Sequence, residues 1–391
     1  MRINCAGSGI NAGACFSESK DIAGMEPERA KRLLVLSIGY GQGHHSAGAA
    51  IAEHYSSTGW ETRMVDACSE ACPFLFRLTQ EFYRFCVRRA PWLWGVTYSL
   101  TDTADWAGLV GNPFFSPVVR RLSELLQEYQ PNLIICTYPL FAYMLDVLRP
   151  AVPYVVLVTD AQEISRPWML SQAKLVTVPD EESLWMVSER YGLDRGMVVA
   201  AGFPVLQAFA PSAGRTAPDE TCLRVLYGAY RRSGGVVADV AALLQEFPQM
   251  KLTVLAGQHE KRLLNRFASH CRSGRLTVLR ETTDMPSLLP ENHFYIGKAG
   301  AATMFECYAA NVPAIVNFTL PGQEQGNLQL LLQDGAGCHV ESTSHLVQVL
   351  RKLLADGAAG WYALCYAMQH ANRTRAAENI AAAIERRFGL R

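Results

Sequence analysis

The sequence predicts an α/β protein built from two doubly wound domains that face a cleft. Short apolar runs, each closed by glycine or a polar residue, alternate with helical periods along most of the 391 residues. The pattern starts afresh after residues 202–220, a stretch rich in proline, alanine and glycine that has no clear period. A chain of this length also suggests two domains. Two parallel sheets, each covered by helices, account for all three observations.

The first domain is expected at residues 31–203, after a poorly ordered leader at residues 1–30. The leader is rich in glycine, serine and alanine and has no hydrophobic core, so we do not expect it to direct secretion. Expected helices lie at residues 45–55, 118–129 and 181–191. Expected strands lie at residues 33–37, 61–66, 132–137, 154–158, 175–178 and 197–200.

The second domain is expected at residues 221–375, after a linker at residues 204–220. Its expected helices lie at residues 236–246, 260–269 and 303–310. A C-terminal helix at residues 376–391 is expected to pack back on the first domain. Expected strands lie at residues 223–227, 251–256, 276–279, 294–296 and 314–318.

Composition excludes several classes of protein. Apolar residues make up 49% of the chain and the formal net charge is +0, which argues against a nucleic-acid binder. The 11 cysteines are scattered, and Cys68 and Cys72 have no second ligand pair at zinc spacing. We therefore expect buried thiols in a reducing compartment and no metal site. No apolar run reaches the roughly 18 residues that a spanning helix needs.

The stretch "LLVLSIGYGQGHHSAGAAIAEHY", residues 33–55, predicts a strand, a glycine loop and a helix. The dinucleotide fingerprint G-x-G-x-x-G is absent, because His44 or Ser46 stands at the third glycine position. His44 lies at a helix N-terminus, which disfavours imidazolium, so a neutral His44 is suited to act as a general base. The alternative is that His44 fixes the turn through the backbone. His45 is expected to be solvated.

Two further loops follow successive strands of the second domain. "GKAGAATMFE", residues 297–306, has small residues that permit close backbone approach and a helix start that suits a diphosphate. Glu306 either closes a capping box with Thr303 or accepts two ribose hydroxyls. "LPGQEQGN", residues 320–327, places amides and a carboxylate in a tight polar turn that suits sugar hydroxyls. Together the loops favour a nucleotide-sugar site.

The segment from Pro73 to Trp94 does not fit the alternation of strands and helices. It predicts an aromatic and basic helix that lies in a membrane interface or packs on the domain with its arginines solvated. Its apolar and basic residues are expected on separate sides: Leu75, Leu78, Phe82 and Phe85 on one, and Arg77, Arg84 and Arg88 on the other.

Four motifs carry a resemblance to a known family. They are "KAGAATMFECYAANVPAIVNFTLPGQEQGN", "YGQGHHSAGAAI", "RAPWLWGVTYSLTD" and "VTDAQEISRPWM". With these motifs, residues 33–337 resemble the diacylglycerol glycosyltransferases, both plant-type monogalactosyldiacylglycerol synthases and bacterial processive diacylglycerol glucosyltransferases. The resemblance implies the GT-B fold, a UDP-sugar held by the second domain and a lipid acceptor held by the first. It also implies an inverting reaction without an essential metal or other cofactor.

The resemblance also assigns roles to residues. It places Glu306 at the donor ribose, and Gln323 and Glu324 at the donor sugar. His44 is the first candidate base, and Asp160, at the tip of a parallel strand, is the second; capping of the next helix is the alternative for Asp160. The expected substrate-binding residues are Gly41, Gly43, Trp168, Gly228, Arg231, Lys298, Gly300, Ala301, Thr303, Glu306, Pro321, Gly322, Gln323, Glu324 and Asn327.

One turn departs from the family pattern. In "YGAYRRSGG", residues 227–235, Tyr230, Arg231 and Arg232 are bulky where the family has glycines, so the arginines meet phosphate or the loop takes another path. The expected function is transfer of a hexose from a UDP-sugar to diacylglycerol by a peripheral protein on the inner face of the membrane. The alternatives are a lipid-linked N-acetylglucosaminyl transferase, a UDP-sugar epimerase and a non-catalytic nucleotide-sugar sensor.

Overall fold

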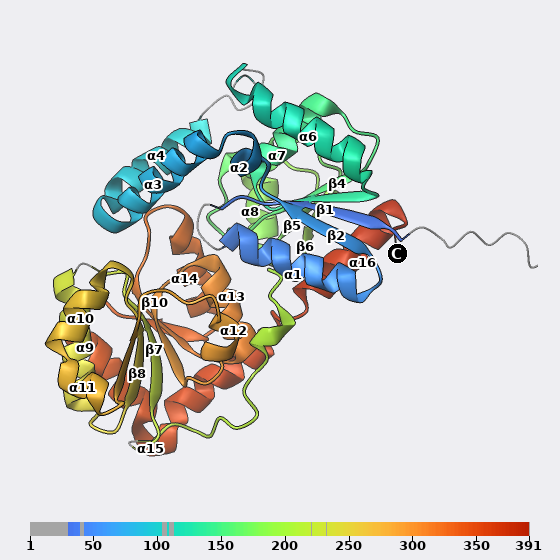
Figure 1. Cartoon of the computed structure of the whole chain (residues 1–391). Coiled ribbons are helices and arrows are strands. Elements are labelled where there is room, and N and C mark those ends of the chain that lie inside the picture. Colours follow the sequence, from blue (N-terminus) through green and yellow to red (C-terminus); the bar gives the residue numbers. More distant parts are fainter. Residues whose placement is uncertain are drawn as a thin grey trace, which may run out of the picture. The chain divides into compact units, whose positions relative to one another are not determined.

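Two six-stranded parallel sheets form the framework of the chain (Figure 1). The computed structural model describes residues 30–39, 43–103, 108, 113–219, 221–231 and 233–390. Both sheets belong to one compact unit, Lys31–Arg391. The predicted doubly wound α/β fold class is confirmed, and the expected leader lies, apart from Ala30, outside the described residues. We call the parts around the first and second sheets the first and second lobes.

The first sheet has the strand order β2-β1-β3-β4-β5-β6. Its strands read as continuous apolar runs because parallel strands are buried on both faces. In β1, Leu33 and Val35 join one core cluster, and Leu34 and Leu36 join the cluster on the other face. The strands are β1 Arg32–Leu36, β2 Glu61–Val65, β3 Leu133–Cys136, β4 Tyr154–Leu157, β5 Val176–Val178 and β6 Val198–Ala200.

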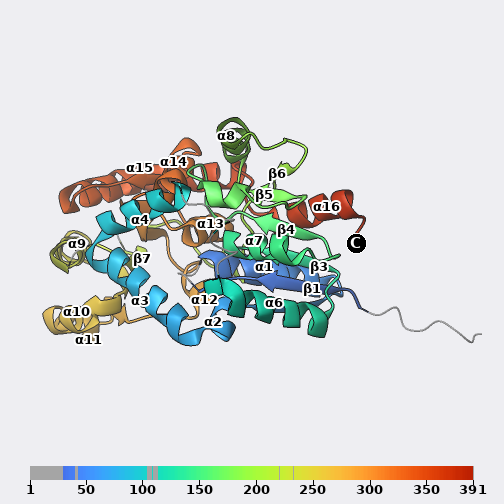
Figure 2. The same ribbon diagram turned by 90° about the horizontal axis from the view of Figure 1, so that it is seen from above.

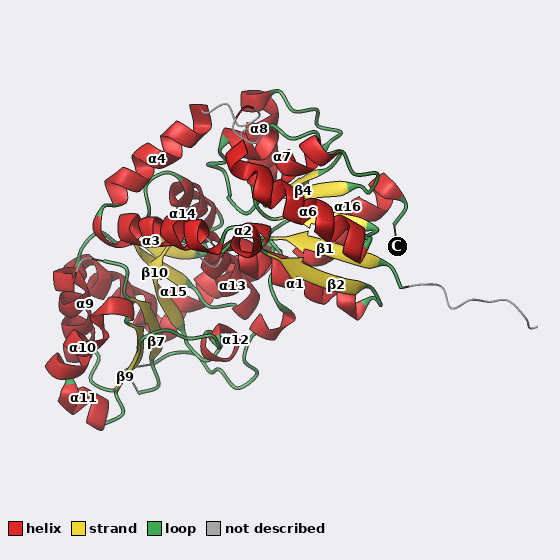
Figure 3. Cartoon of the chain, turned by 45° about the horizontal axis from the view of Figure 1, so that its top comes forward, coloured by secondary structure: helices red, strands yellow, loops and turns green. Residues whose placement is uncertain are grey.

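Helices cover both faces of this sheet (Figure 3). Helix α1, Gly43–Ser57, buries Ala47, Ile51 and Tyr55 against one face. The other face is covered by helices whose apolar residues recur at helical spacing. They are α6 Ser116–Tyr129, α7 Pro139–Leu148 and α8 Glu181–Tyr191.

The second sheet has the strand order β12-β11-β10-β7-β8-β9. Its strands are β7 Arg224–Gly228, β8 Lys251–Leu255, β9 Leu276–Leu279, β10 Phe294–Lys298, β11 Ala314–Phe318 and β12 Gly337–His339. Its helices are α9 Ser233–Glu246, α10 Glu260–Arg266, α11 Ala268–Arg272, α12 Met285–Leu288, α13 Ala301–Ala310, α14 Gln323–Gln333 and α15 Thr343–His370.

Several elements differ from the sequence expectation. The expected helix at residues 260–269 is two short helices, α10 and α11. Strand β12 was not predicted, since it has only 3 residues and all are half-buried. The expected polar turn at residues 320–327 ends at Gly322, and helix α14 starts at Gln323. Polar residues misled the prediction, because Glu324 and Asn327 are buried helix residues.

The chain returns to the first lobe at its C-terminal helix. Helix α16, Ala376–Phe388, contacts α1 and lies beside the first sheet (Figures 1 and 2). The Asn379 side-chain amide donates to the Ala201 carbonyl at 3.3 Å. Gly202 has φ +98 and approaches Ala376 so closely that an added β-carbon would lie 2.7 Å from the Ala376 side chain. These contacts join the end of the chain to the end of β6.

A buried aspartate organises the turn after β7. Asp239 of α9 is fully buried and accepts hydrogen bonds from the Tyr227 hydroxyl at 2.7 Å, Arg231 at 2.9 Å and the Thr343 hydroxyl at 2.5 Å. The Asn317 amide donates to the same Tyr227 hydroxyl at 3.1 Å. Arg231 therefore closes the turn onto α9. The guanidinium of Arg231 neutralises a buried carboxylate, and binding of substrate by Arg231 stays a prediction.

Replacing Asp239 by alanine is expected to destabilise the second lobe strongly. The change leaves Arg231 without its counter-ion and two hydroxyl donors without an acceptor, so the free energy of unfolding should fall by about 3–5 kcal/mol. Urea denaturation measures this. The matched control is Glu189→Ala, which breaks the exposed Arg195–Glu189 pair and should cost at most about 1 kcal/mol. Equal losses in both variants would contradict a structural role for Asp239.

Candidate active site

The carboxyl ends of strands from both sheets meet at one set of loops. Ligands bind at this edge in open parallel α/β sheets. The loop after β4 and helix α14 touch directly: the Ala161 N–H donates to the Asn327 side chain at 3.3 Å, and the Gln162 amide donates to Gln333 at 2.7 Å. The candidate residues of the first lobe therefore lie beside those of the second.

His44 lies in the first turn of α1. Its Nδ1 shares a 2.8 Å hydrogen bond with the hydroxyl of buried Thr159, and its ring contacts Tyr138 and Trp168 at centroid distances of 5.2 and 5.9 Å. Burial lowers the pKa of His44 to about 4, and a hydrogen bond that the imidazole donates to the backbone of Thr137 opposes this shift. The imidazole is therefore neutral at physiological pH, as predicted, and its neighbour His45 is exposed, also as predicted.

Asp160 follows β4 and faces the second lobe. Burial raises its pKa to about 6, the Trp168 indole N–H opposes this with a 2.9 Å hydrogen bond, and the Glu324 carboxylate raises the pKa further. Trp168 is only 2% exposed, so it packs in the interior next to Asp160 and does not lie on the surface. The capping alternative for Asp160 is wrong, because Ser165 precedes the next helical turn, Arg166–Met169.

On the second-lobe side of the site, Glu324 makes the main polar contacts. It is 1% exposed, it pairs with the Lys298 ammonium, and it accepts the Leu320 N–H at 2.8 Å. Burial alone would lower the pKa of Lys298, but the Glu324 carboxylate more than reverses this, so the pKa lies above its usual value. The missing side chain of Gly300 leaves room for this pair, since an added β-carbon would lie 2.7 Å from Lys298 Nζ.

Helix α14 packs tightly on the loop after β4. The Asn327 amide donates to the Ala299 carbonyl at 3.0 Å while its oxygen accepts from Ala161, so one side chain ties both lobes together. A β-carbon on Gly326 would lie 2.0 Å from the Ala161 carbonyl oxygen and 2.6 Å from the Glu163 nitrogen. No side chain fits at Gly326 without a shift of the backbone.

Glu306 lies on α13 and points toward the first lobe. It is 7% exposed, burial raises its pKa to about 7, and a hydrogen bond from the Ser46 side chain of α1 opposes the shift. Helix α13 begins after Gly300, with Ala301 and Thr303 in its first turn. The capping-box interpretation of Thr303 and Glu306 is therefore wrong, and the Glu306 carboxylate bonds across to the first lobe instead.

The remaining predicted residues fall in three places. Gly43 starts α1, while Gly41 and the side chain of Gln323 lie outside the described residues. Gly228 packs against the Tyr230 ring, and this ring also lies 5.5 Å from Lys298 Nζ. The last two residues of the turn before α14, Pro321 and Gly322, contact a helix of the first lobe, α4 at Pro91–Thr103.

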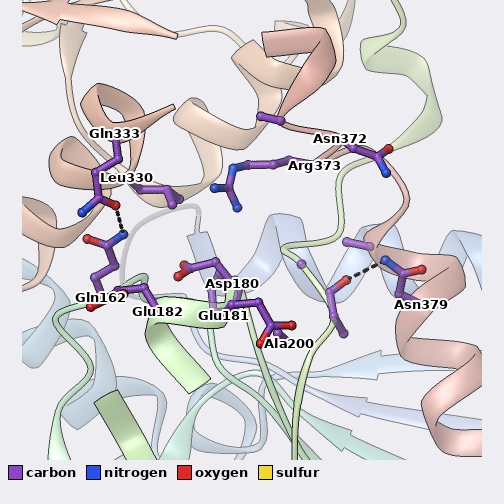
Figure 4. A pocket seen from close by; sticks show the side chains of 15 residues that line it. Gln162, Asp180, Glu181, Glu182, Ala200, Leu330, Gln333, Asn372, Arg373 and Asn379 are labelled. Carbon is purple, nitrogen blue, oxygen red and sulfur yellow. Dashed lines mark hydrogen bonds between the residues drawn. The ribbon is translucent and has the colours of Figure 1, made fainter. Parts of the chain in front are cut away.

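A separate cavity of about 300 Å³ lies behind this site (Figure 4). It is lined from both lobes, and the Gln162–Gln333 hydrogen bond crosses one end of it. Its one lining arginine, Arg373, donates two hydrogen bonds to Asp334. None of the predicted catalytic or substrate-binding residues lines this cavity.

Sequence reasoning missed several residues of the site. Ser46 and Thr159 carry polar side chains at strand ends or helix starts, a position that could have singled them out. Tyr83 of α3, Pro73–Arg89, interacts electrostatically with Lys298, Glu324 and Asp160, and burial raises the pKa of its phenol. No local pattern separates Tyr83 from the other aromatic residues of its helix. In the described part of the chain, His, Cys, Asp and Glu form no group suited to hold a metal.

Comparison with known proteins identifies the family. Residues 44–205 match the monogalactosyldiacylglycerol (MGDG) synthase family, and residues 235–384 match the C-terminal domain of glycosyltransferase family 28. This chain is a glycosyltransferase of the MGDG synthase family. The predicted family and enzyme class are confirmed.

The similarity to individual proteins of this family is distant. The chain is 25% identical to a probable chloroplastic MGDG synthase of Nicotiana tabacum over 383 residues, which are 89% of this chain and 70% of the relative. It is 24% identical to the processive diacylglycerol β-glucosyltransferase of Bacillus subtilis over 341 residues, 83% of this chain and 87% of the relative. This chain covers 66% of the length of another plant relative, the chloroplastic MGDG synthase of Spinacia oleracea.

Solved structures bear out the GT-B fold of this glycosyltransferase. The crystal structure of MurG from Acinetobacter baumannii superposes with a TM-score of 0.57 at 15% sequence identity, covering 91% of this chain and 99% of that one. At this identity the likeness concerns the fold alone.

The substitution Gly326→Ala is expected to separate the two halves of the site. The new β-carbon meets backbone atoms of the Asp160 loop, so α14 must shift, and misplacement by about 1 Å costs about 100-fold in kcat/KM. The rate of sugar transfer measures the loss. Gly214→Ala is the control, because an added β-carbon there meets nothing within 4 Å. Wild-type kcat/KM in Gly326→Ala would show that the close packing is dispensable.

Proposed function

We propose that this glycosyltransferase moves a hexose from a UDP-sugar to diacylglycerol, or to a related lipid, at a membrane surface and with inversion at the anomeric carbon. One observation carries the proposal. The buried carboxylates Glu306 and Glu324 stand on helices of the second lobe; Glu324 interacts with Asp160 of the first lobe, and Glu306 bonds to Ser46, two residues after His44 in α1.

The second lobe offers groups that match each part of a UDP-sugar. Glu306 accepts two hydroxyls of the ribose, and Glu324 accepts hydroxyls of the sugar while Lys298 holds it in place. The N-terminus of α13, at Gly300 and Ala301, binds the diphosphate through backbone N–H groups. The same N-terminus and the Lys298 ammonium stabilise the charge that develops on the leaving UDP.

A base in the first lobe removes the proton from the attacking hydroxyl of the lipid. His44 is neutral and able to accept it, but its pKa of about 4 makes it a weak base. Asp160 has a pKa of about 6, closer to the working pH, and lies near Glu324. Both residues contact the Trp168 ring, which supports the proposal that the acceptor hydroxyl binds near them.

An apolar stripe on α3 supplies contact with the lipid surface. Phe74, Leu78, Phe82 and Phe85 are 82%, 59%, 46% and 51% exposed and recur at spacings that place them on one side of the helix. A contiguous exposed apolar stripe of this kind marks an interaction surface.

The sequence prediction for this helix needs one correction. Leu75, expected on the apolar side, is half-buried, and Phe74 takes its place. Arg77 is exposed beside the stripe, where it suits the headgroups of anionic lipids. In the described residues no helix is both long enough and apolar enough to cross a bilayer. We therefore place the protein peripherally at the membrane, with the segment from Pro73 to Trp94 as its contact.

The reaction product is the first test. The full chain is incubated separately with radiolabelled UDP-glucose, UDP-galactose and UDP-N-acetylglucosamine, with and without vesicles that contain diacylglycerol. We expect one labelled hexose on diacylglycerol and release of UDP. Label on a lipid-linked acceptor, an epimerised free donor, or tight UDP binding without turnover would support a different GT-B enzyme or a sensor.

The pH dependence of kcat/KM distinguishes the two candidate bases. A base must be deprotonated in the free enzyme, so with Asp160 in this role kcat/KM should fall as pH drops below about 6, and with His44 it should stay level down to about 4. His44→Ala should keep UDP affinity and lose transfer about 100- to 10,000-fold. Near-normal turnover in His44→Ala removes His44 from the mechanism. An acid limb near pH 6 that persists in Asp160→Asn removes Asp160.

A further inference from the structure

Helix α4 has two faces of opposite character. Trp92, Val96 and Leu100, spaced 4 residues apart, are 69%, 49% and 63% exposed, and α4 contacts helix α3, which carries the apolar stripe. Gly95 and Tyr98 lie on the inner side and contact the site loops. The two helices lie side by side (Figures 1 and 2).

Tyr98 touches the loops of both lobes at once. Its hydroxyl donates to the Glu163 carbonyl, in the loop after β4, at 3.0 Å. Its ring packs on Gly322, where an added β-carbon would lie 2.8 Å from the ring and where φ is +98. One turn earlier in α4, Gly95 packs on Pro321, with 3.2 Å between an added β-carbon and the Pro321 side chain.

The turn that Tyr98 contacts determines where Glu324 lies. Residues 320–322 run from β11 to α14, and Glu324 stands in the first turn of that helix. The Glu324 carboxylate accepts the Leu320 N–H, so one side of the turn is held by the carboxylate itself. The other side of the turn is held by the Tyr98 ring.

We propose that Tyr98 is a positioning residue for the turn at residues 320–322, and that seating the outer face of α4 in a lipid bilayer tightens the binding of the UDP-sugar. The occupant is a bilayer because α4 contacts α3, whose exposed apolar stripe and exposed Arg77 suit a surface of anionic lipid. The inference rests on the proposed function. It adds that the membrane contact and the donor site are coupled through one helix.

Linkage makes the coupling reciprocal. A bilayer that raises affinity for the UDP-sugar by some factor must have its own affinity raised by the same factor when the UDP-sugar is bound. Couplings between sites usually amount to about 5- to 100-fold. Tyr98→Ala removes both the ring and the hydroxyl, so the factor should fall to about 1 while the apolar outer face is left intact.

The test measures donor affinity without any acceptor. Calorimetry gives the Kd of UDP-glucose, UDP-galactose and UDP-N-acetylglucosamine for the full chain, with and without vesicles of phosphatidylcholine and phosphatidylglycerol. Vesicle flotation gives membrane binding. We expect vesicles to lower the Kd of at least one donor about 5-fold or more in the wild type. The control Tyr362→Ala, at a side chain 54% exposed on α15, should behave as the wild type.

The variants separate the inference from the proposed function. Tyr98→Ala should float with vesicles and show no change in donor Kd, and Tyr98→Phe, which keeps the ring, should show a reduced change. Trp92→Ser with Leu100→Ser should lose the gain in affinity and still bind vesicles, though more weakly, because the α3 stripe is left intact. The inference alone is overturned if the wild-type protein binds vesicles but its Kd for every donor stays unchanged. It is also overturned if both Tyr98 variants gain as much donor affinity on vesicles as the wild type does. A wild-type protein that does not float overturns it together with the membrane part of the proposed function.

Discussion

The packing of helix α14 on the loop after β4 is the contact on which the rest of the site depends. Gly326 lies so close to the Ala161 carbonyl that only a hydrogen fits between them, and Asn327 bonds to Ala161 and to Ala299. The loop carries Asp160, and the helix carries Glu324 in its first turn. One close backbone contact therefore fixes the distance between the candidate base and the residue proposed to hold the donor sugar.

Three buried carboxylates dominate the electrostatics of this region. Glu324 is paired with the Lys298 ammonium, whereas Asp160 and Glu306 are held by neutral donors, the Trp168 indole and the Ser46 hydroxyl. Burial without a counter-ion raises their pKa values to about 6 and about 7. Carboxyl groups with such shifted pKa values in a concave site are typical of functional residues.

The strands and the overall architecture could be predicted from the sequence because each buried parallel strand is a short apolar run. Leu33 to Leu36 and Ile134 to Cys136 are fully buried, and their pattern is unambiguous. Helix α14 could not be predicted, because its first turns are polar and their burial comes from the opposite lobe. The role of Arg231 depends on Asp239, which lies two turns along the next helix, and no local pattern joins them. The contacts of the inner face of α4 could not be predicted for the same reason, since Tyr98 contacts loops that lie more than 60 residues further along the chain.

The nucleotide is proposed to bind in the second lobe, although the glycine loop of the first lobe resembles a nucleotide-binding loop. Hydrogen exchange of the full chain with saturating UDP tests this directly. We expect slower exchange of the backbone amides at residues 299–303, at the start of α13, with little change at residues 37–39 and 43–46. Protection confined to the glycine loop and the start of α1, with none in α13, would contradict it.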